Sequence, residues 1–396
     1  MSNTVMQDIR PADAASTISA LQYEIRLDDL SPRVSWGSSI PISGVLLTDA
    51  PEVLRVLSEK FEIRVGLKVF DGEQKVRELR GPPLEVPSEQ GSLPVAISFH
   101  TDYLRPGPHR CEIDLVIDGL RWFGKPTRVN VDVDSSESFV DVKDLIRKLS
   151  VEELAATAER YFKEHADSEW MYRKPYSVRD IQHNWPQVAV LVRGLNLKPG
   201  MSVIDFGAGT GWISRTLRNL GMEVHSLDVS QTALAIGKKI LESENSLYPR
   251  PPMSFHQFDG RRFPFADQSI SRVLCNDALH HIPNIAEVVG EMYRVLAPGG
   301  IAGFCEPGER HSLEPRAQEE MKLFTVLEND IDLTEINAIA LKAGFRDMFI
   351  SLFSPYPVDI GFHEWQTLSP TSNAIKAYAS NAYSRMKLNT VFFLRK

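Results

Sequence analysis

Cysteine is scarce in this chain: Cys111, Cys275 and Cys305 are its only three among 396 residues. An odd number cannot pair completely, and all three lie inside apolar runs that are typical of strands. We therefore expect buried free thiols, with neither a disulfide framework nor the spacing of a cysteine metal site. This use of cysteine favours a reducing, cytoplasmic location.

Long apolar runs and an excess of positive charge are also missing. No stretch approaches 18 consecutive apolar residues, and the first residues lack the basic and apolar segments of a signal peptide. We therefore expect no membrane insertion and no signal peptide. The formal net charge is −8, which argues against nucleic acid as a partner.

The first part of the chain is rich in apolar residues that recur with a period of two. The runs "FEIRVGLKVF", "RCEIDLVIDGLRWF" and "TRVNVDVD" alternate in this way, and Asp118-Gly119 is typical of a hairpin turn. Of the segments with helical spacing, "PEVLRVLSEK" is the one that stands out. Several short alternating strands predict an N-terminal antiparallel β-sandwich.

The second part of the chain alternates near-continuous apolar runs with helical segments. Such strands are typical of a parallel sheet that is covered on both faces, so we expect a C-terminal doubly wound α/β sheet. The polar stretch "DSSES" marks the boundary. The predicted organisation is a tail at 1–22, the sandwich at 23–134, a helical linker at 135–169 and the α/β domain at 170–396, with an insertion at 355–389.

The segment "VIDFGAGTGWISRTL" has the pattern of a strand, a glycine loop and a helix. Its glycines, Gly207, Gly209 and Gly211, are spaced G-x-G-x-G and not G-x-G-x-x-G, which argues against a dinucleotide and against an NAD-dependent oxidoreductase. Asp205, Asp228 and Asp259 each end or follow a predicted strand. An edge with three carboxylates favours a nucleoside without phosphates, and an acidic side chain at the second strand suits ribose hydroxyls.

The motifs "VIDFGAGTG", "LDVS", "FDG", "CNDALHHI" and "RVLAPGG" resemble, as a set, the class I S-adenosylmethionine-dependent methyltransferases of type 11. The resemblance spans about residues 170–396. It implies a Rossmann-like sheet with an antiparallel last strand and S-adenosylmethionine as the methyl donor. The expected donor-binding residues are Asp205, Gly207, Ala208, Gly209, Gly211, Asp228, Val229, Asp259, Gly260 and Asn276.

Methyl transfer to a hydroxyl needs a base, whereas an amine or thiolate acceptor does not always need one. His281 is the first candidate because an imidazole titrates near neutral pH; His280, Asp277 and Glu306 are the others. Each histidine has an alternative role in local packing. No spacing rule supports a metal site, including one built from Glu306, His311 and Asp277.

Aromatic and basic residues precede the glycine loop in "HADSEWMYRKPYSVRDIQHNWPQ". In methyltransferases of this kind a leading helix often closes over the donor, which makes Trp170, Tyr172, Arg173 and Lys174 candidates for a lid. Packing on the core is the alternative. Trp212, directly after the third glycine, stays open between helix packing and the site.

The predicted sandwich resembles, more loosely, the carbohydrate-recognition domain fused to ATPases of O-antigen ABC exporters, in "LRPGPHRCEIDLV" and "DGLRWF". Exposed aromatic side chains stack on sugar rings, and the candidates are Trp36, Tyr103, Trp122 and Phe123. Strand alternation would bury either Trp122 or Phe123.

These features favour an enzyme that O-methylates a sugar of a bacterial surface polysaccharide or its precursor. One alternative is a small-molecule methyltransferase of quinone or natural-product type, in which the sandwich serves docking or dimerisation. Another is a non-catalytic glycan-binding or chain-length-regulating protein. The expected partners are a glycan or small-molecule acceptor, a second copy of the chain or polysaccharide-assembly proteins.

Overall fold

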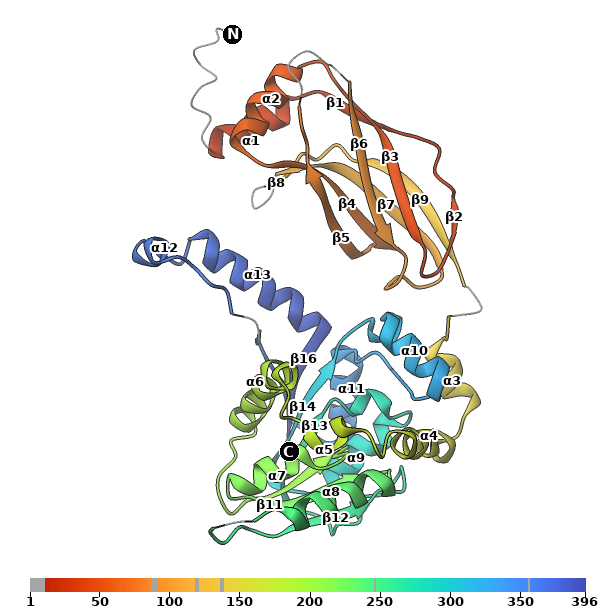
Figure 1. Cartoon of the computed structure of the whole chain (residues 1–396), viewed down its shortest axis with the longest axis vertical. Coiled ribbons are helices and arrows are strands. Elements are labelled where there is room, and N and C mark those ends of the chain that lie inside the picture. Colours follow the sequence, from red (N-terminus) through yellow and green to blue (C-terminus); the bar gives the residue numbers. More distant parts are fainter. Residues whose placement is uncertain (1–10, 87–91, 118–120, 136–138, 246, 355–356) are drawn as a thin grey trace. The chain divides into compact units, whose positions relative to one another are not determined.

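The computed structural model describes residues 11–86, 92–117, 121–135, 139–245, 247–354 and 357–396. The chain divides into two compact units, residues 1–139 and 140–396, which we describe separately (Figure 1). The division falls next to the predicted polar boundary. The predicted hairpin turn Asp118-Gly119 lies outside the described residues.

Unit 1 consists of two sheets that enclose one hydrophobic core. The first has the strand order β1-β3-β6, and the second has the order β2-β9-β7-β4-β5, with β8 paired to β7. Their bounds are β1 Tyr23–Leu27, β2 Arg33–Ser35, β3 Ser39–Thr48, β4 Ile63–Asp71, β5 Gln74–Pro83, β6 Ser92–His100, β7 Gly107–Ile117, β8 Arg121–Trp122 and β9 Thr127–Asp134.

The period of two in the sequence sets which face of each strand is buried. Along β3 and β6 buried and exposed residues alternate, as a half-buried strand requires. The pairing of β2 with β9 is parallel, which differs from the antiparallel arrangement predicted for this region. Two helices accompany the strands, α1 (Pro11–Ala20) and α2 (Pro51–Lys60).

Helix α1 lies within the segment predicted as a tail. Ile18 and Leu21, in and just after this helix, are almost fully buried and belong to the core of unit 1. The apolar residues of this segment do not recur with a helical period clear enough to predict a helix. Helix α2 corresponds to "PEVLRVLSEK", and its Leu54 and Leu57 are buried.

Unit 2 contains a seven-stranded sheet with the order β12-β11-β10-β13-β14-β16-β15. Strand β16 pairs antiparallel with both neighbours, whereas the pairs from β12 to β14 are parallel. The Rossmann-like sheet and its antiparallel last strand are therefore confirmed. The bounds are β10 Ser202–Phe206, β11 Glu223–Asp228, β12 Met253–Gln257, β13 Ile270–Asn276, β14 Leu296–Pro307, β15 Asp347–Ser351 and β16 Asn389–Arg395.

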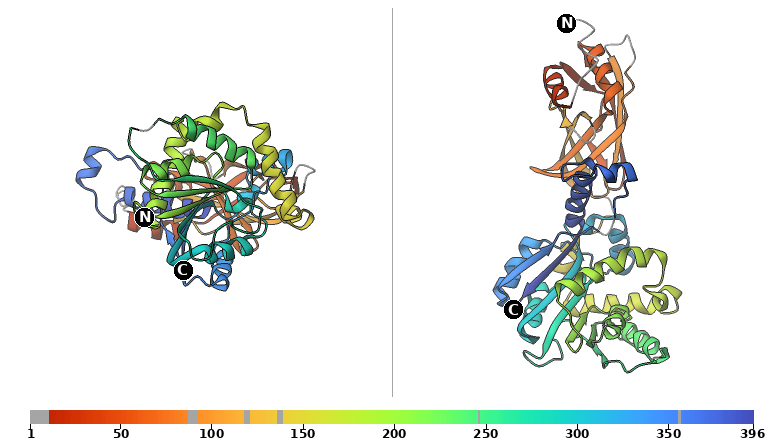
Figure 2. Two further views of the ribbon diagram at one scale, coloured as in Figure 1. Left: turned by 90° about the horizontal axis from the view of Figure 1, so that it is seen from below. Right: turned by 90° about the vertical axis from the view of Figure 1, so that its left-hand side faces the viewer.

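Helices cover both faces of this sheet (Figure 1, Figure 2). The helices of unit 2 are α3 Val142–Lys148, α4 Val151–Glu164, α5 Glu169–Arg173, α6 Val178–Gly194, α7 Trp212–Asn219, α8 Gln231–Ser243, α9 Ile285–Val295, α10 Pro315–Phe324, α11 Leu333–Ala343, α12 Phe362–Gln366 and α13 Asn373–Leu388, with short 3-10 helices η2 Leu279–His281 and η3 His311–Leu313. Of these, α12 and α13 extend away from the sheet (Figure 1). Val203 packs into one core and Ile204 into another, so β10 is buried on both faces.

Helices α3 and α4 occupy the segment predicted as a linker, and α4 packs against α8 of the same unit. Helices α12 and α13 occupy the predicted insertion; its residues 355 and 356 lie outside the described part. Cys111, Cys275 and Cys305 are buried and unpaired, as expected. Among the described residues, no helix is both long and apolar enough to cross a bilayer.

Candidate donor and acceptor site

A cavity of about 640 Å³ opens at the carboxyl ends of β10, β11 and β13 in unit 2. This is the edge of a parallel sheet at which ligands of α/β proteins bind. Of the predicted donor-binding residues, the cavity is lined by Asp205, Gly207, Ala208, Gly209, Asp228, Val229, Gly260 and Asn276. Gly211 and Asp259 are not among the lining residues.

The glycine loop joins β10 to α7 in a conformation that suits glycine. The φ angles of Gly207, Gly209 and Gly211 are +70°, +52° and +71°, all in the left-handed region. A Cβ on Gly207 would lie 2.2 Å from the Cβ of Ala278, closer than real carbon atoms approach. The loop can therefore pack this closely against Ala278 only because residue 207 is a glycine.

Asp228, the last residue of β11, holds this loop. Its Oδ2 accepts the backbone N–H of Gly209 and its Oδ1 accepts that of Ser230, both at 2.8 Å. Burial raises the pKa of the Asp228 carboxyl, and the hydrogen bonds from these N–H groups partly offset this rise. A carboxylate oxygen can accept more than one hydrogen bond, so both oxygens of Asp228 can also accept from ligand hydroxyls.

Asp205, in β10, connects the sheet to helix α7. Its Oδ2 accepts a hydrogen bond from Ser214 Oγ at 2.6 Å, and Ser226 Oγ donates to Ser214 Oγ at 2.7 Å. Burial raises the pKa of Asp205 to about 7. Asp205 therefore braces the loop as well as lining the cavity.

Asp259 is exposed and supports a turn. Its Oδ1 accepts the backbone N–H groups of Arg261 and Arg262 at 2.8 and 2.7 Å. The neighbouring Phe258 and Gly260 line the cavity instead. A contact of Asp259 with adenine stays a prediction.

Asn276 is the last residue of β13 and Asp277 follows it, on the side of β10 opposite to β11. Oδ1 of Asn276 is buried and has no hydrogen-bond partner among the described residues, which is typical of an atom that binds a ligand or water. Asp277 has a φ of +57° and is fixed by its N–H, which donates to the carbonyl of Cys305 at 2.8 Å. The Asp277 side chain is exposed to solvent. Desolvation by the protein atoms around it raises the pKa of its carboxyl, but the charges of nearby His280, Lys174 and His281 outweigh this and lower that pKa.

His281 lines the cavity, and its tautomer follows from one contact. Its Nδ1 lies 2.6 Å from the carbonyl oxygen of Leu327, which can only accept, so Nδ1 carries the proton. In the neutral ring Nε2 is then the unprotonated nitrogen. Oε1 of Glu328 lies 3.5 Å from the same Nδ1.

His280 and Glu306 are buried behind the cavity wall and are not among its lining residues. Oε2 of Glu306 lies 2.8 Å from His280 Nδ1, and Oε1 accepts the backbone N–H of Ala278 at 3.1 Å. Burial lowers the pKa of His280, but its contact with Glu306 outweighs this and raises it. Both residues thus hold the turn that carries Asp277 and His281, and direct roles in proton transfer stay predictions.

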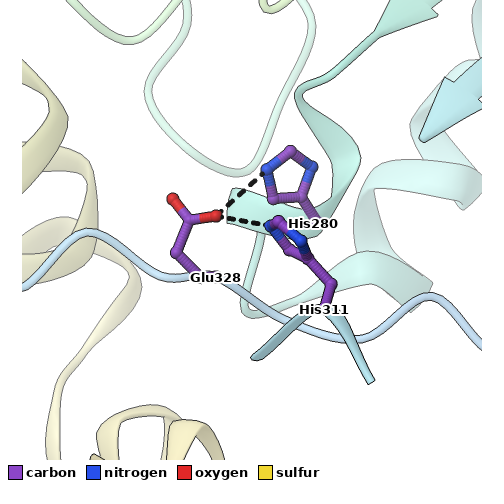
Figure 3. A group of neighbouring side chains, drawn as sticks. All are labelled: His280, His311 and Glu328. Atoms are coloured by element: carbon purple, nitrogen blue, oxygen red, sulfur yellow. Dashed lines mark hydrogen bonds and ion pairs between the residues drawn. The ribbon is translucent and has the colours of Figure 1, made fainter. Parts of the chain in front are cut away.

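No metal site was expected from the sequence, but His311 lies with His280 and Glu328, and not with Glu306 and Asp277, in a group that could hold a metal ion (Figure 3). His311 Nε2 lies 2.7 Å from Glu328 Oε2. Burial raises the pKa of Glu328, but the nearby histidines outweigh it and hold this pKa at about 2. Glu328 was not a candidate site residue in the sequence analysis, because the segment between α10 and α11 in which it lies carries no motif.

The lid candidates behave differently. Trp170 and Lys174 line the cavity, whereas Tyr172 and Arg173 are not among the lining residues. Trp170 is 46% exposed, so its ring is available to a ligand. Trp212 is buried, lines the cavity and packs edge-to-face on Trp185, with ring centroids 6.3 Å apart.

Helices α4, α6 and α10 supply a wall that sequence reasoning missed. The lining residues from these helices include Tyr161, Phe162, Arg179, Asp180, His183, Asn184, Arg316 and Glu320. The helical period of "VEELAATAERYF" predicts α4, but a period does not show which surface of a helix meets a ligand. The wall combines aromatic rings with charged and amide groups.

The aromatic candidates in unit 1 differ in their availability to a ligand. Trp36 donates from Nε1 to the carbonyl of Leu104 at 3.0 Å, and Phe123 is buried. The Trp122 ring has Lys68 Nζ 3.9 Å from its centroid and the Arg80 guanidinium 4.7 Å from it. Tyr103 is 39% exposed.

Comparison with known proteins identifies the kind of domain in unit 2. Residues 204–304 match the family model described as "Methyltransferase domain". This segment contains the glycine loop, Asp228, Asn276 and His281. Unit 2 therefore contains a methyltransferase domain, of the kind that takes its methyl group from S-adenosylmethionine.

Individual relatives match part of the chain. Methyltransferase GfsG of Streptomyces halstedii is 30% identical over 161 residues, 39% of this chain and 56% of that protein. A demethylmenaquinone methyltransferase of Renibacterium salmoninarum is 32% identical over 121 residues, 30% of this chain and 47% of that protein. The chain thus spans about half the length of the curated relatives it matches.

A solved phosphoethanolamine N-methyltransferase 2 of Haemonchus contortus, in complex with S-adenosylhomocysteine, has 18% identity and a TM-score of 0.42. The match covers 68% of this chain and 62% of that one. A TM-score this low carries no weight for the activity.

Proposed function

We propose that the chain is an S-adenosylmethionine-dependent methyltransferase that O-methylates a sugar of a bacterial surface polysaccharide or its precursor. The observation that carries this proposal is His281, whose Nδ1 is fixed by the Leu327 carbonyl at the cavity wall. A hydroxyl needs a base when it becomes a nucleophile, and this ring offers an unprotonated Nε2.

The donor half of the cavity suits a nucleoside with a positive charge and no phosphate. Asp228 offers its carboxylate, and Asn276 offers a buried, unpartnered oxygen. When bound, S-adenosylmethionine supplies an electrophilic methyl group. The residues of this chain hold the donor and exclude water, because positioning dominates the catalysis of such a displacement.

The acceptor half combines groups that suit a polyhydroxylated molecule. Tyr161 and Trp170 offer ring surfaces, and Asp180 and Asn184 offer hydrogen-bonding groups beside them. Aromatic rings stack on the apolar faces of sugars, and buried polar groups need polar partners. Arg316 and Glu320 of the same wall pair with each other at 2.9 Å, so the half-buried Asp180 and Asn184 are the polar groups proposed to meet the acceptor.

We assign proton transfer in this reaction to His281. Its Nε2 would take the proton of the acceptor hydroxyl while the oxygen bonds to the methyl carbon and the bond from that carbon to the donor sulfur breaks, with the electron pair left on sulfur. The ring then becomes positively charged, which the nearby carboxylate of Glu328 stabilises. Asp277 holds a second negative charge at the same wall.

In this proposal unit 1 binds the glycan chain that carries the acceptor sugar. Tyr103 is the candidate with an exposed ring among those named above. Cations lie over both rings: the Arg77 guanidinium is 5.5 Å from the Tyr103 centroid, and Lys68 and Arg80 pack on Trp122.

A second candidate is a methyltransferase for a quinone or natural product. It is favoured by the names of the relatives, which include methyltransferase GfsG and demethylmenaquinone methyltransferase. In that case unit 1 would serve docking or dimerisation. A non-catalytic glycan-binding protein is disfavoured by the complete glycine loop and by the fixed tautomer of His281.

The test is incubation of the full chain with methyl-labelled S-adenosylmethionine and two acceptor panels. One contains polysaccharide fragments and nucleotide- or lipid-linked sugars, and the other contains demethylated quinones and phenolic natural products. Mass spectrometry then locates the labelled methyl group. A labelled methyl group on a sugar oxygen supports the proposal, and one on a quinone or phenol supports the second candidate. Donor binding with no transfer to either panel contradicts both.

A further inference from the structure

Three side chains from separate parts of unit 2 meet directly behind the cavity wall (Figure 3). His280 belongs to η2, His311 to η3, and Glu328 to the segment between α10 and α11. One donor atom of each lies within 4.8 Å of the others. Within the described part of the chain, no other group of three or more metal-ligating side chains meets this condition.

The contacts of these three side chains direct the atoms that could bind a metal toward one another. His280 Nδ1 is held by Glu306 Oε2 at 2.8 Å, so Nε2 is the nitrogen that faces Glu328, at 3.6 Å from its Oε2. A histidine that binds a metal is usually oriented in this way, by a carboxylate on its other ring nitrogen. His311 Nε2 lies 2.7 Å from the same Glu328 oxygen.

One carboxylate oxygen of the group lacks a hydrogen-bond partner. Glu328 is 4% exposed. Its Oε1 is buried and accepts no hydrogen bond from the described residues, although His281 Nδ1 lies 3.5 Å from it. A buried carboxylate oxygen without a partner is costly, and in native structures it often marks an ion or water. Glu306, the second carboxylate at this place, is 1% exposed.

We propose that His280, His311 and Glu328 bind a divalent transition-metal ion of the zinc class. Two imidazoles and one carboxylate are ligands typical of Zn²⁺ and Fe²⁺, and they suit Mg²⁺ less well. Bonds of about 2.0–2.2 Å place the ligands of a tetrahedral ion about 3.3 Å apart. The separations of 2.7 and 3.6 Å need only small side-chain shifts to match.

The ion would fix the wall that carries the proposed base. His281 follows His280 directly, and Leu327, whose carbonyl orients His281, precedes Glu328. Because His280, His311 and Glu328 are not among the lining residues, the ion has a positioning role and does not touch the acceptor. Metal binding itself does not depend on the proposed methyl transfer.

The test is titration of chelator-treated full chain with Co²⁺, which reports its coordination by visible absorption, followed by competition with Zn²⁺. We expect one equivalent of Co²⁺ with nitrogen and oxygen ligands, displaced by one equivalent of Zn²⁺. No saturable binding, or binding with the spectrum of hexa-aqua Co²⁺, would overturn the proposal.

Variants locate the ion. Glu328→Gln and His311→Ala should abolish stoichiometric binding, and Glu306→Gln should weaken it about 10–100-fold, as loss of an orienting carboxylate does. His363→Ala, at an exposed histidine of α12, is the matched control and should bind as the unchanged chain does. Circular dichroism checks folding, and equal binding by a folded His311→Ala variant would also overturn the proposal.

Discussion

The carboxylate of Asp228 accepts the backbone N–H of Gly209 at 2.8 Å, so the end of β11 holds the middle glycine of the loop that follows β10. One residue thereby connects two neighbouring strand ends and presents its remaining hydrogen-bonding capacity to the cavity. The loop and its acidic partner are therefore parts of one site.

Replacement of Asp228 by alanine should weaken donor binding. The change removes a buried carboxylate and releases the N–H of Gly209, so we expect a loss of about 1–3 kcal/mol of binding free energy for S-adenosylmethionine and S-adenosylhomocysteine. Calorimetry measures both. Asp259→Ala, at an exposed residue outside the cavity lining, is the control; a larger loss there would mean that Asp259 contacts the ligand after all.

Gly207→Ala should destabilise the loop. The new Cβ would meet that of Ala278 in a left-handed backbone conformation, which costs about 1–3 kcal/mol from backbone strain alone. Urea unfolding and donor titration should both show the loss. Gly290→Ala in α9, where a Cβ meets nothing within 4 Å, should instead be neutral or stabilising by up to about 1 kcal/mol. Equal effects of the two substitutions would argue against the close approach at Gly207.

His281→Gln should slow transfer and leave donor binding intact. Removal of a general base typically costs a factor of about 10²–10⁴ in rate. The measurements are kcat with the acceptor that the labelling experiment identifies, and the donor affinity of the same variant. His363→Gln is the control. An unchanged kcat would indicate an acceptor that needs no base, such as an amine.

The stability of the protein should depend on pH through Asp205. The pKa of aspartate is about 3.9 in an unfolded chain, whereas burial raises the pKa of Asp205 to about 7. Folding therefore favours the protonated form, and this contribution is fully present below about pH 4 and is lost as the pH rises through about 7. Each unit of pKa difference corresponds to about 1.4 kcal/mol.

Asp205→Asn removes this titration and keeps an oxygen that can accept from Ser214. Relative to the unchanged chain, its free energy of unfolding should be higher at pH 8 than at pH 5, as measured by urea denaturation. Asp259→Asn should follow the unchanged chain, because that residue is exposed. Parallel curves for the unchanged chain and Asp205→Asn would contradict a raised pKa.

Much of unit 2 could be predicted from local patterns. Buried parallel strands are nearly continuously apolar, and the glycines between β10 and α7 are needed locally for their positive φ angles. The helix α1 could not be predicted in this way, because its burial depends on the core that unit 1 builds around Ile18. The same holds for α4, whose helical period was evident but whose contact with the cavity was not.

Within the site, the sequence by itself determined the residues that stand at strand ends, namely Asp205, Asp228 and Asn276, because a strand and its following turn are short-range features. Only the tertiary structure decided what the two adjacent histidines face. His281 lines the cavity and His280 points into a buried group, because Glu306, Leu327 and Glu328 reach them from segments distant in the chain. Contacts between such segments follow from the packing of the whole unit, which no local pattern encodes.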